Sequence, residues 1–308
     1  MSILVRPCGD ADRELLRSLV QDPSIAPQFD TFQGPEGLEH KMADRRLARD
    51  GIRLAFVDGE PAGFGVPWLL PQATSVWTMT RIGVLERFRR RGIGTRIGES
   101  LLDFARAGAP ASGPIEVAGS AWLPSDAAVA LATRLGFAHE RYFWLMERAR
   151  GGVPAPGFPA DITVRTFDGT DAMLGEWLDV YNDSFSEHYR HVIARLDDIR
   201  PLVRVPGFRP DGVALAYRGT RCLGFVRTER LESRGEIAVL GTAHAARGIG
   251  LGRALLRWGV AWLEANSTTP VTLLVDGENE GALALYRSEG FSIAQTRQIW
   301  GRVLAGPA

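Results

Sequence analysis

The residues best suited to chemistry in this sequence form a glycine-rich motif that occurs twice. The first copy reads Arg89-Arg90-Arg91-Gly92-Ile93-Gly94 and the second reads Arg247-Gly248-Ile249-Gly250-Leu251-Gly252, so both fit Arg-x-x-Gly-x-Gly. Each copy follows an apolar segment typical of a strand and precedes a segment with helical periodicity. A glycine-rich turn ahead of a helix offers backbone N–H groups and the positive end of the helix dipole to an anion, and arginine adds a charge that suits phosphate. The sequence therefore predicts two phosphate-binding turns.

Composition excludes several classes of protein. The chain has 308 residues, of which 45% are hydrophobic, and its 36 basic residues balance its 36 acidic ones. That balance gives no general attraction to nucleic acid, and the length suits about two domains. The two cysteines, Cys8 and Cys222, are too few for a disulfide framework, and no Cys/His spacing suggests a metal site. No apolar run approaches the ~18 residues of a membrane span. We therefore expect a cytoplasmic protein, monomeric or homodimeric, with no metal, nucleic-acid or membrane partner.

Weaker similarities extend the repeat over most of the chain. Ile3-x-Val5-Arg6 recurs as Ile162-x-Val164-Arg165, and Leu135-Gly136-Phe137 is matched by Glu289-Gly290-Phe291. The segment between the halves is rich in proline and glycine, as linkers are. The sequence predicts one domain at 1–150, a linker at 151–160 and a second domain at 161–308.

The order of predicted elements is the same in each half. It runs strand, one or two helices, several strands, the glycine-rich turn, helix, strand, helix and strand. The expected fold class is α/β (an α+β mixed sheet), with a mostly antiparallel twisted sheet flanked by helices in each domain. A dinucleotide-binding fold is excluded because its glycine motif would follow the first strand, whereas here the turn follows the middle strands.

The second half resembles the GCN5-related N-acetyltransferase superfamily. The resemblance rests on Arg247, Gly250 and Gly252, followed by Asn279-x-x-Ala282-x-x-x-Tyr286-x-x-x-Gly290-Phe291. It implies two tandem domains of this superfamily and acetyl-CoA as cofactor, with the turn holding the pyrophosphate and the preceding strand edge pairing with the pantetheine arm. The coenzyme-binding residues that it implies are Leu240, Gly241, Thr242, Arg247, Gly248, Ile249, Gly250, Leu251, Gly252, Arg253 and Asn279 in the second half, and Ile82, Val84, Arg89, Arg90, Arg91, Gly92, Ile93, Gly94 and Thr95 in the first.

The resemblance also implies an acid and a base for acetyl transfer to a primary amine. A protonated amine is not a nucleophile and a departing thiolate benefits from a proton, so both groups have a task. Glu236, eleven residues before Arg247, resembles the general base, and Tyr286 matches the usual general acid. The alternatives are that Glu236 is a solvated strand residue and that Tyr286 packs on the core.

The first half keeps the turn but lacks these groups. By the same counting, Thr78 stands where Glu236 does, Ala132 where Tyr286 does and Ser125 where Asn279 does. Asp126 or Glu99 could substitute, although no spacing favours them. We expect the N-terminal domain to be catalytically degenerate, and its sequence leaves open whether it binds coenzyme A.

The acceptor is less defined. The first helices of this superfamily usually line the acceptor site, so Phe185 and His188 are candidate substrate contacts, with core packing and a surface position as the alternatives. The string Gly235-Glu236-x-x-Val239-Leu240-Gly241 is similar to the mycothiol synthases, which acetylate the cysteinyl amine of a sugar-inositol thiol, although Glu187-His188-Tyr189-Arg190 departs from their pattern. We expect a small-molecule N-acetyltransferase whose catalytic domain is the C-terminal one. The alternatives are mycothiol synthase proper and a non-catalytic coenzyme A sensor.

Overall fold

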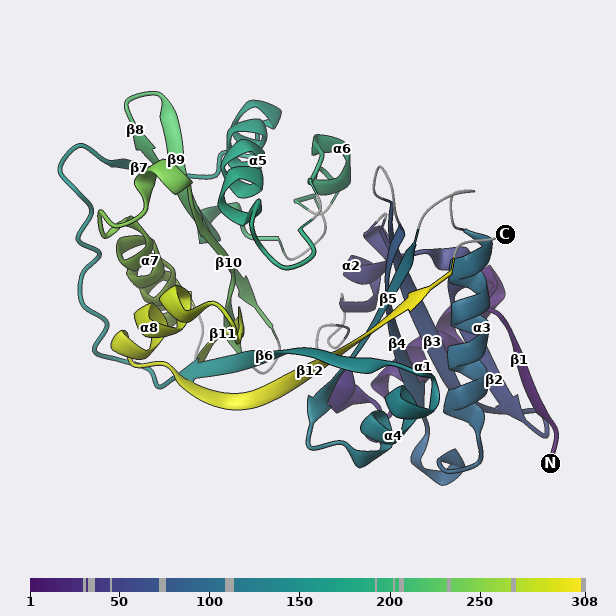
Figure 1. Cartoon of the computed structure of the whole chain (residues 1–308). Helices are drawn as coiled ribbons and strands as arrows, with labels where there is room; N and C mark the ends of the chain where they lie inside the picture. The colour runs from purple at the N-terminus through teal and green to yellow at the C-terminus, as the bar shows by residue number, and fades with distance from the viewer. Residues whose placement is uncertain are drawn as a thin grey trace. The chain divides into compact units, whose positions relative to one another are not determined.

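The computed structural model describes residues 1–308 except 30, 31, 33–36, 45, 72–75, 109–113, 192, 202, 205–207, 232, 233, 267–269 and 306–308. The chain divides into two compact units (Figure 1). Unit 1 comprises Met1–Phe143 together with Thr296–Ala308, and unit 2 comprises Trp144–Gln295. Each unit contains one copy of the glycine-rich turn.

Unit 1 is a sheet covered on both faces. Its strands lie in the order β1-β2-β3-β4-β5-β12, and every neighbouring pair is antiparallel except β4 and β5, which are parallel. Helix α3 covers one face, because a side chain at Gly65 would meet Ile97 and Leu101 of that helix. The bounds are β1 Ile3–Pro7, α1 Arg13–Gln21, α2 Gly37–Ala43, β2 Arg53–Val57, β3 Glu60–Pro71, β4 Val76–Val84, α3 Ile93–Ala107, β5 Ile115–Leu123, α4 Asp126–Arg134 and β6 Ala138–Arg148, whose last residues enter unit 2.

Unit 2 repeats this arrangement. Its strands lie in the order β6-β11-β10-β9-β8-β7, with β10 and β11 parallel. Helix α7 covers one face, and α5 covers the other through the contact of Trp177 with Phe225. The bounds are β7 Thr163–Thr166, α5 Asp171–Phe185, α6 Leu196–Ile199, β8 Val213–Arg218, β9 Arg221–Arg230, β10 Gly235–Thr242, α7 Leu251–Asn266, β11 Val271–Asp276, α8 Glu280–Ser288 and β12 Ser292–Leu304, whose last residues belong to unit 1. The mixed, mostly antiparallel sheet with flanking helices confirms the predicted fold class.

The units differ from the expected domains 1–150 and 161–308 because the end of the C-terminal strand belongs to unit 1. Residues Thr296–Leu304 of β12 pair antiparallel with Leu123–Ile115 of β5, so the last strand of the chain completes the sheet of unit 1. Ile299, Trp300 and Leu304 are buried there. The burial of these apolar side chains, with the hydrogen bonds of the β5 edge, favours this pairing.

The expected linker, residues 151–160, contains no helix or strand and lies in unit 2. It is held at its start by the half-buried carboxylate of Glu264, which accepts hydrogen bonds from Arg148 and from the Gly151 N–H, both at 2.8 Å. The beginning of the segment is therefore fixed to the end of α7.

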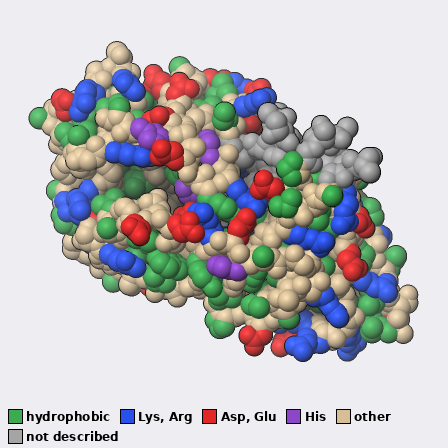
Figure 2. Space-filling view, viewed as in Figure 1, with side chains coloured by type: hydrophobic (Ala, Val, Ile, Leu, Met, Phe, Trp, Pro, Cys, Tyr) green, Lys and Arg blue, Asp and Glu red, His purple; other side chains and the backbone are tan. Residues whose placement is uncertain are grey.

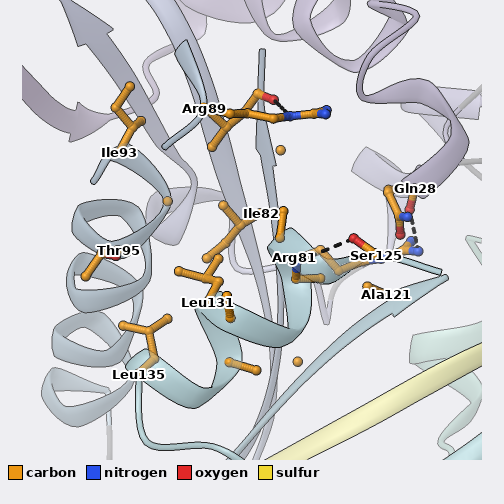
Figure 3. A pocket seen from close by; sticks show the side chains of 18 of the residues that line it. Gln28, Arg81, Ile82, Arg89, Ile93, Thr95, Ala121, Ser125, Leu131 and Leu135 are labelled. Atoms are coloured by element: carbon orange, nitrogen blue, oxygen red, sulfur yellow. Dashed lines mark hydrogen bonds between the residues drawn. The ribbon is translucent and has the colours of Figure 1, made fainter. Parts of the chain in front are cut away.

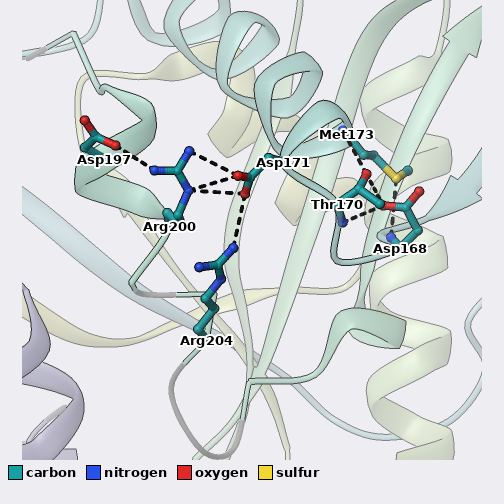
Figure 4. Close-up of polar contacts among 7 residues, drawn as sticks. All are labelled: Asp168, Thr170, Asp171, Met173, Asp197, Arg200 and Arg204. Carbon is teal, nitrogen blue, oxygen red and sulfur yellow. Dashed lines mark hydrogen bonds and ion pairs between the residues drawn. The ribbon is translucent and has the colours of Figure 1, made fainter.

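Polar contacts fix the start of α5 (Figure 4). The Thr170 hydroxyl caps the helix by accepting from the Met173 N–H at 3.2 Å. Asp171 pairs with Arg200 of the α6 region and with Arg204, and the hydrogen bond from Arg200 is the main reason why the pKa of the Asp171 carboxyl is lowered. These contacts hold α6 against the helix that carries Phe185.

The surface carries charges of both signs. On the face drawn in Figure 2, basic and acidic side chains are interspersed, as the balanced composition predicts. In the part of the chain that the structure describes, no helix has the length and apolar character that crossing a membrane requires.

Candidate functional site

The two glycine-rich turns share one backbone conformation. Arg90 and Gly92 of unit 1 have φ of 65° and 81°, and Gly248 and Gly250 of unit 2 have φ of 82° and 83°. Both turns thus use the left-handed region at the second and fourth positions of the motif, which glycine favours. Gly92, at the N-cap of α3, provides no capping side chain, so the first N–H groups of α3 are available to an anion.

The first arginine of each motif binds the protein itself. Arg89 donates to the Val84 carbonyl at 3.1 Å and to the Ser24 carbonyl, while Arg247 donates to the Ser184 carbonyl at 3.4 Å and to Glu187 at 3.2 Å. These bonds tie each turn to the last turn of the first helix of its unit or to the segment just after that helix. Backbone N–H groups of the turn, and in unit 1 also Arg90, can therefore serve as donors to a phosphate.

A cavity of about 600 Å³ opens beside the turn of unit 1 (Figure 3). Its volume lies within the range of small-molecule pockets, roughly 300–1,000 Å³. Of the residues predicted to bind coenzyme in this half, Arg91 does not line it and instead stacks on Phe88. The predicted residues that line it are Ile82, Val84, Arg89, Arg90, Gly92, Ile93, Gly94 and Thr95.

The sequence analysis did not identify the rest of this cavity wall. It is formed by Gly119–Ala121 of β5, by apolar residues of α4 such as Leu131, and by Trp300 of β12. Gln28 and Arg81 also line it and lie side by side, because Arg81 donates to the Gln28 carbonyl at 2.7 Å. The place of α4 and β12 in this wall depends on their packing against β5, which the glycine-rich motif does not indicate.

In unit 2 the strand before the turn diverges from its parallel neighbour. β10 pairs with β11 only from Gly235 to Ile237, so the edge of Val239–Thr242 that faces away from β9 has no strand partner in the described residues. The predicted pantetheine-binding residues Leu240, Gly241 and Thr242 lie on this edge. Their backbone groups are positioned to pair with an extended ligand.

A β-bulge distinguishes β10 from β4. Ile237 opposes Thr228 and Val239 opposes Arg227, so Ala238 is an extra residue in β10. The pairing of β4 with β3 is continuous. Side chains on one side of the extra residue therefore point to the opposite face of the sheet from the one they would take in a strand without the bulge.

Glu236 lies on the α5 face of the sheet. Ile237 faces α7, because its side chain lies within reach of Gly259, so its neighbour Glu236 projects from the opposite face. The carboxylate pairs with Arg234 at 3.2 Å, and its side chain is 16% exposed. Arg227 and Glu229 of β9 form a second ion pair on the same face at 2.6 Å. Glu236 thus belongs to a half-buried polar cluster.

Tyr286 is buried on α8. Its side chain packs against Phe291 with ring centroids 6.1 Å apart, and burial raises the pKa of its phenol to about 12. Within the described part of the chain its hydroxyl makes no hydrogen bond. Such a phenol keeps its proton at neutral pH.

The other motif residues around α8 have local structural roles. Asn279 caps the helix, its side-chain oxygen accepting from the Ala282 N–H at 3.0 Å, and Ser125 caps α4 in the same way. Gly290 ends α8 with φ of 86°, and Gly136 ends α4 with φ of 72°. The shared Asn/Ser…Gly-Phe pattern therefore marks a helix start and a left-handed helix end.

Arg253, a predicted coenzyme contact, pairs with Glu289 and donates to Ser288 at 2.9 Å. Burial opposes ionisation of Glu289, but hydrogen bonds from Arg257 and Arg253 outweigh it and lower the pKa of the carboxyl. This ionic contact fixes α8, which carries Tyr286, to α7, which begins at the turn.

The candidate acceptor residues lie at the end of α5. Phe185 packs on Tyr181 at 4.9 Å and on the His188 ring at 5.5 Å between centroids. His244, after β10, contacts Asp183 at 3.3 Å and Glu187 at 3.0 Å. The C-terminal end of α5 is thereby joined to the segment that leads into the turn of unit 2.

Strand register changes which residue of unit 1 is equivalent to Glu236. Without a bulge in β4, Met79 opposes Trp68 as Glu236 opposes Glu229, so Met79 rather than Thr78 occupies the position of Glu236. Thr78 faces α3 and is fully buried. Unit 1 therefore has no carboxylate at this position by either count.

The sequence matches that of known proteins over most of its length. The sequence model of the Acetyltransferase (GNAT) family matches residues 16–137 and 174–291, one segment in each half. The chain belongs to this family. It is a tandem GNAT protein and an N-acetyltransferase, and the family supports an acyl-CoA as the donor.

The curated relatives include mycothiol acetyltransferases. That of Thermomonospora curvata is 33% identical over 260 residues, covering 82% of this chain and 83% of the relative. That of Parafrankia sp. is 32% identical over 284 residues, covering 79% and 84%.

Two solved structures share the fold. A GCN5-related N-acetyltransferase from Sphaerobacter thermophilus has a TM-score of 0.71 and 22% identity, covering 99% of this chain and 97% of its own. A tandem GNAT protein from the clavulanic acid biosynthesis pathway has a TM-score of 0.72 and 15% identity over the full length of both chains. At these identities the likeness concerns the fold alone.

Proposed function

We propose that unit 2 transfers the acetyl group of acetyl-CoA to the primary amine of a small molecule, with Glu236 as general base and Tyr286 as general acid. The observation that carries this proposal is the bulge at Ala238. It combines a carboxylate on the α5 face with an unpaired strand edge beyond it, and the turn of α7 follows directly. The base, the binding edge for the pantetheine arm and the phosphate site thus follow one another along one segment.

The base has to create the nucleophile. An alkylamine is mostly protonated at neutral pH, with a pKa of about 10. The carboxylate of Glu236, half-buried beside Arg234, would accept that proton directly or through water. A backbone N–H on the free edge of β10 would stabilise the oxyanion that forms when the amine attacks the thioester carbonyl.

The acid assists the departure of the thiolate. With a pKa of about 12, the Tyr286 phenol is a weaker acid than the coenzyme thiol that it would protonate, whose pKa is about 8.5 by analogy with cysteine. Complete proton transfer is therefore unfavourable, and the role that this environment supports is a strong hydrogen bond to the developing thiolate. The phenol keeps its proton, and the coenzyme thiolate takes a proton from solvent as it leaves.

Unit 1 holds coenzyme A without transferring the acyl group in this proposal. Its turn has the same backbone as that of unit 2 and borders the cavity. Met79 and Ala132 replace the base and the acid. The Gln28 amide pairs with the backbone of Trp122, accepting at 2.8 Å and donating at 3.0 Å, while Arg81 holds Gln28 from β4. These contacts bridge β4 and β5 beyond their last pair, Thr80 and Gly119, and make Gln28 and Arg81 part of the cavity wall.

The relatives are named mycothiol acetyltransferases, and the resemblance to the mycothiol synthases implies the cysteinyl amine of a sugar-inositol thiol as the acceptor. Identity near one third over about four fifths of the chain supports the same reaction type, but Glu187-His188-Tyr189-Arg190 departs from their pattern at the acceptor end of α5. We propose a small amine in general and this one as the first to test.

The test is an acetyl-transfer assay with the full chain. Free thiol release from acetyl-CoA is followed with the cysteinyl sugar-inositol thiol, blocked at sulfur so that only coenzyme thiol is detected, and with a panel of other small primary amines. Turnover with at least one amine that is abolished in Glu236→Gln and retained in Met79→Leu supports the proposal. Tight coenzyme binding without turnover on any amine would contradict it.

A further inference from the structure

One wall of the unit 1 cavity comes from the far end of the sequence. Trp300 of β12 lines the cavity and is 6% exposed. It lies outside both segments that match the family, which end at residues 137 and 291. Nothing in the turn or in the repeat assigns a role to this residue.

The indole has a defined place beneath α4. Trp300 opposes Gly119 of β5, and directly opposed residues of an antiparallel pair project to the same face. The indole packs with Ala121 of β5 and with Ala132. Ala132 belongs to α4, so the ring fills the layer between that helix and the sheet.

The strand that carries Trp300 is anchored on both sides of it. Two residues later, Arg302 donates to the Leu135 carbonyl at the end of α4, and two residues earlier, Gln298 is bonded to the His139 Nδ1 at 3.0 Å. Leu304 is buried with Leu102 and Ile115. The position of the indole is therefore set by the fold rather than by a flexible terminus.

The cavity changes character between the turn and this wall. Near Arg89 and Arg90 it is basic and offers backbone N–H groups, whereas Ile82, Leu131 and Trp300 supply apolar surface elsewhere on its wall, alongside the polar Gln28 and Arg81. A ligand with phosphate at one end and an apolar thioester arm at the other matches that gradient.

We propose that Trp300 is a binding residue of the unit 1 cavity and contacts the acyl-pantetheine arm of an acyl-CoA. This inference rests on the proposed binding of coenzyme at this cavity. It also makes the N-terminal site dependent on β12, Ser292–Leu304, although the turn itself lies at residues 89–94. Truncated chains that end before β12 would lack a complete cavity, although all residues of the turn would be present.

The experiment follows amide hydrogen exchange by mass spectrometry with coenzyme A as the probe, on the full chain. Exchange reports local protection in each turn separately. In the parent protein we expect coenzyme A to protect residues 89–95 and 247–253. In Trp300→Ala, protection of residues 89–95 should need about tenfold more coenzyme A, as expected when a large aromatic contact is removed. Protection of residues 247–253 should be unchanged.

Two variants guard against a trivial result. Trp300→Phe keeps an apolar ring and should weaken the first site less than Trp300→Ala does. Trp262→Phe on α7 of unit 2 is the matched control and should leave the first site intact. If Trp300→Ala raises the exchange of all of unit 1 in the absence of ligand, that variant destabilises the unit. The coenzyme affinity of Trp300→Phe then decides whether Trp300 is a binding residue.

The outcomes separate the two proposals. Parent-like protection at 89–95 in both Trp300 variants would overturn the role of Trp300. Protection at 247–253 alone in the parent would also overturn it, while leaving the function of unit 2 standing. Absence of protection at both turns in the parent would contradict the proposed coenzyme binding itself.

Discussion

Substitution of Tyr286 by phenylalanine separates catalysis from stability. The side chain is 8% exposed and its hydroxyl makes no hydrogen bond within the described residues. Removing that hydroxyl loses no bond and relieves the cost of burying a polar group. We therefore expect the free energy of unfolding of Tyr286→Phe to stay the same or to rise by up to about 1 kcal/mol.

The expected kinetic effect is opposite in sign. If the phenol donates a hydrogen bond to the developing thiolate, the interaction is charge-assisted and worth about 1.5–3 kcal/mol. That corresponds to a loss of about ten- to 150-fold in kcat. Complete proton transfer would give a larger loss, up to about 10⁴-fold.

Tyr217 offers a matched control in the same unit. Its hydroxyl donates to Glu176 at 2.6 Å, and the side chain is 1% exposed, with its pKa raised by burial and by this bond. Tyr217→Phe should lower the free energy of unfolding by about 1.5 kcal/mol, because a buried hydrogen bond to a carboxylate is lost, and should leave kcat unchanged.

The assay measures coenzyme thiol release at saturating acetyl-CoA alongside urea denaturation. An unchanged kcat in Tyr286→Phe across the pH range would refute the acid assignment. A loss of stability equal to that of Tyr217→Phe would show that the Tyr286 hydroxyl is bonded and would refute the description of its environment.

Three further substitutions test other parts of the site. Glu236→Gln should lower kcat/KM by about 10²–10⁴-fold and move the pH profile to higher pH, because the amine must then lose its proton to solvent; an unaltered profile would sink the base assignment. Gln28→Ala should lower the free energy of unfolding of unit 1 by about 1–2 kcal/mol in urea denaturation, because it unpairs the Trp122 backbone. Acetyl transfer should be unchanged, and a changed turnover rate would count against catalysis by unit 2 alone. Glu289→Gln should destabilise unit 2 by about 2 kcal/mol, since it leaves two partly exposed arginines without their carboxylate. Because folding lowers the pKa of Glu289, its contribution is complete above the unfolded value near 4.5 and is lost as the pH falls through the folded value. The stability difference from the parent should therefore vanish in acid, and its persistence there would disprove the ionic explanation.

Local features of the fold could be read from the sequence. The turn glycines, the helix cap at Asn279 and the helix end at Gly290 each follow from the conformation of a few neighbouring residues. The same holds for α3 and α7, whose apolar periodicity identified their buried faces. Such signals need no knowledge of distant partners.

The partner of the last strand could not be read in this way. β12 is apolar along much of its length, and the repeat makes the free edges of the two sheets look alike to a local argument. Its pairing with β5 depends on contacts such as those of Trp300 and Leu304 with residues more than a hundred positions away. Sequence periodicity gives the type of such a strand but not its neighbour.

The bulge at Ala238 is the clearest case of a non-local feature that decides function. Counting residues back from the turn paired Glu236 with Thr78, yet strand register pairs it with Met79, since β4 lacks the extra residue. Thr78 consequently faces α3, and its buried hydroxyl has no hydrogen-bond partner among the described residues, whereas Glu236 faces α5 in a polar cluster. One inserted residue thus moves an entire strand segment to the other face while leaving the spacing to the turn unchanged. Equal spacing in a repeat therefore does not imply equal placement, and the loss of a base in unit 1 involves the geometry of β4 as well as the identity of one residue.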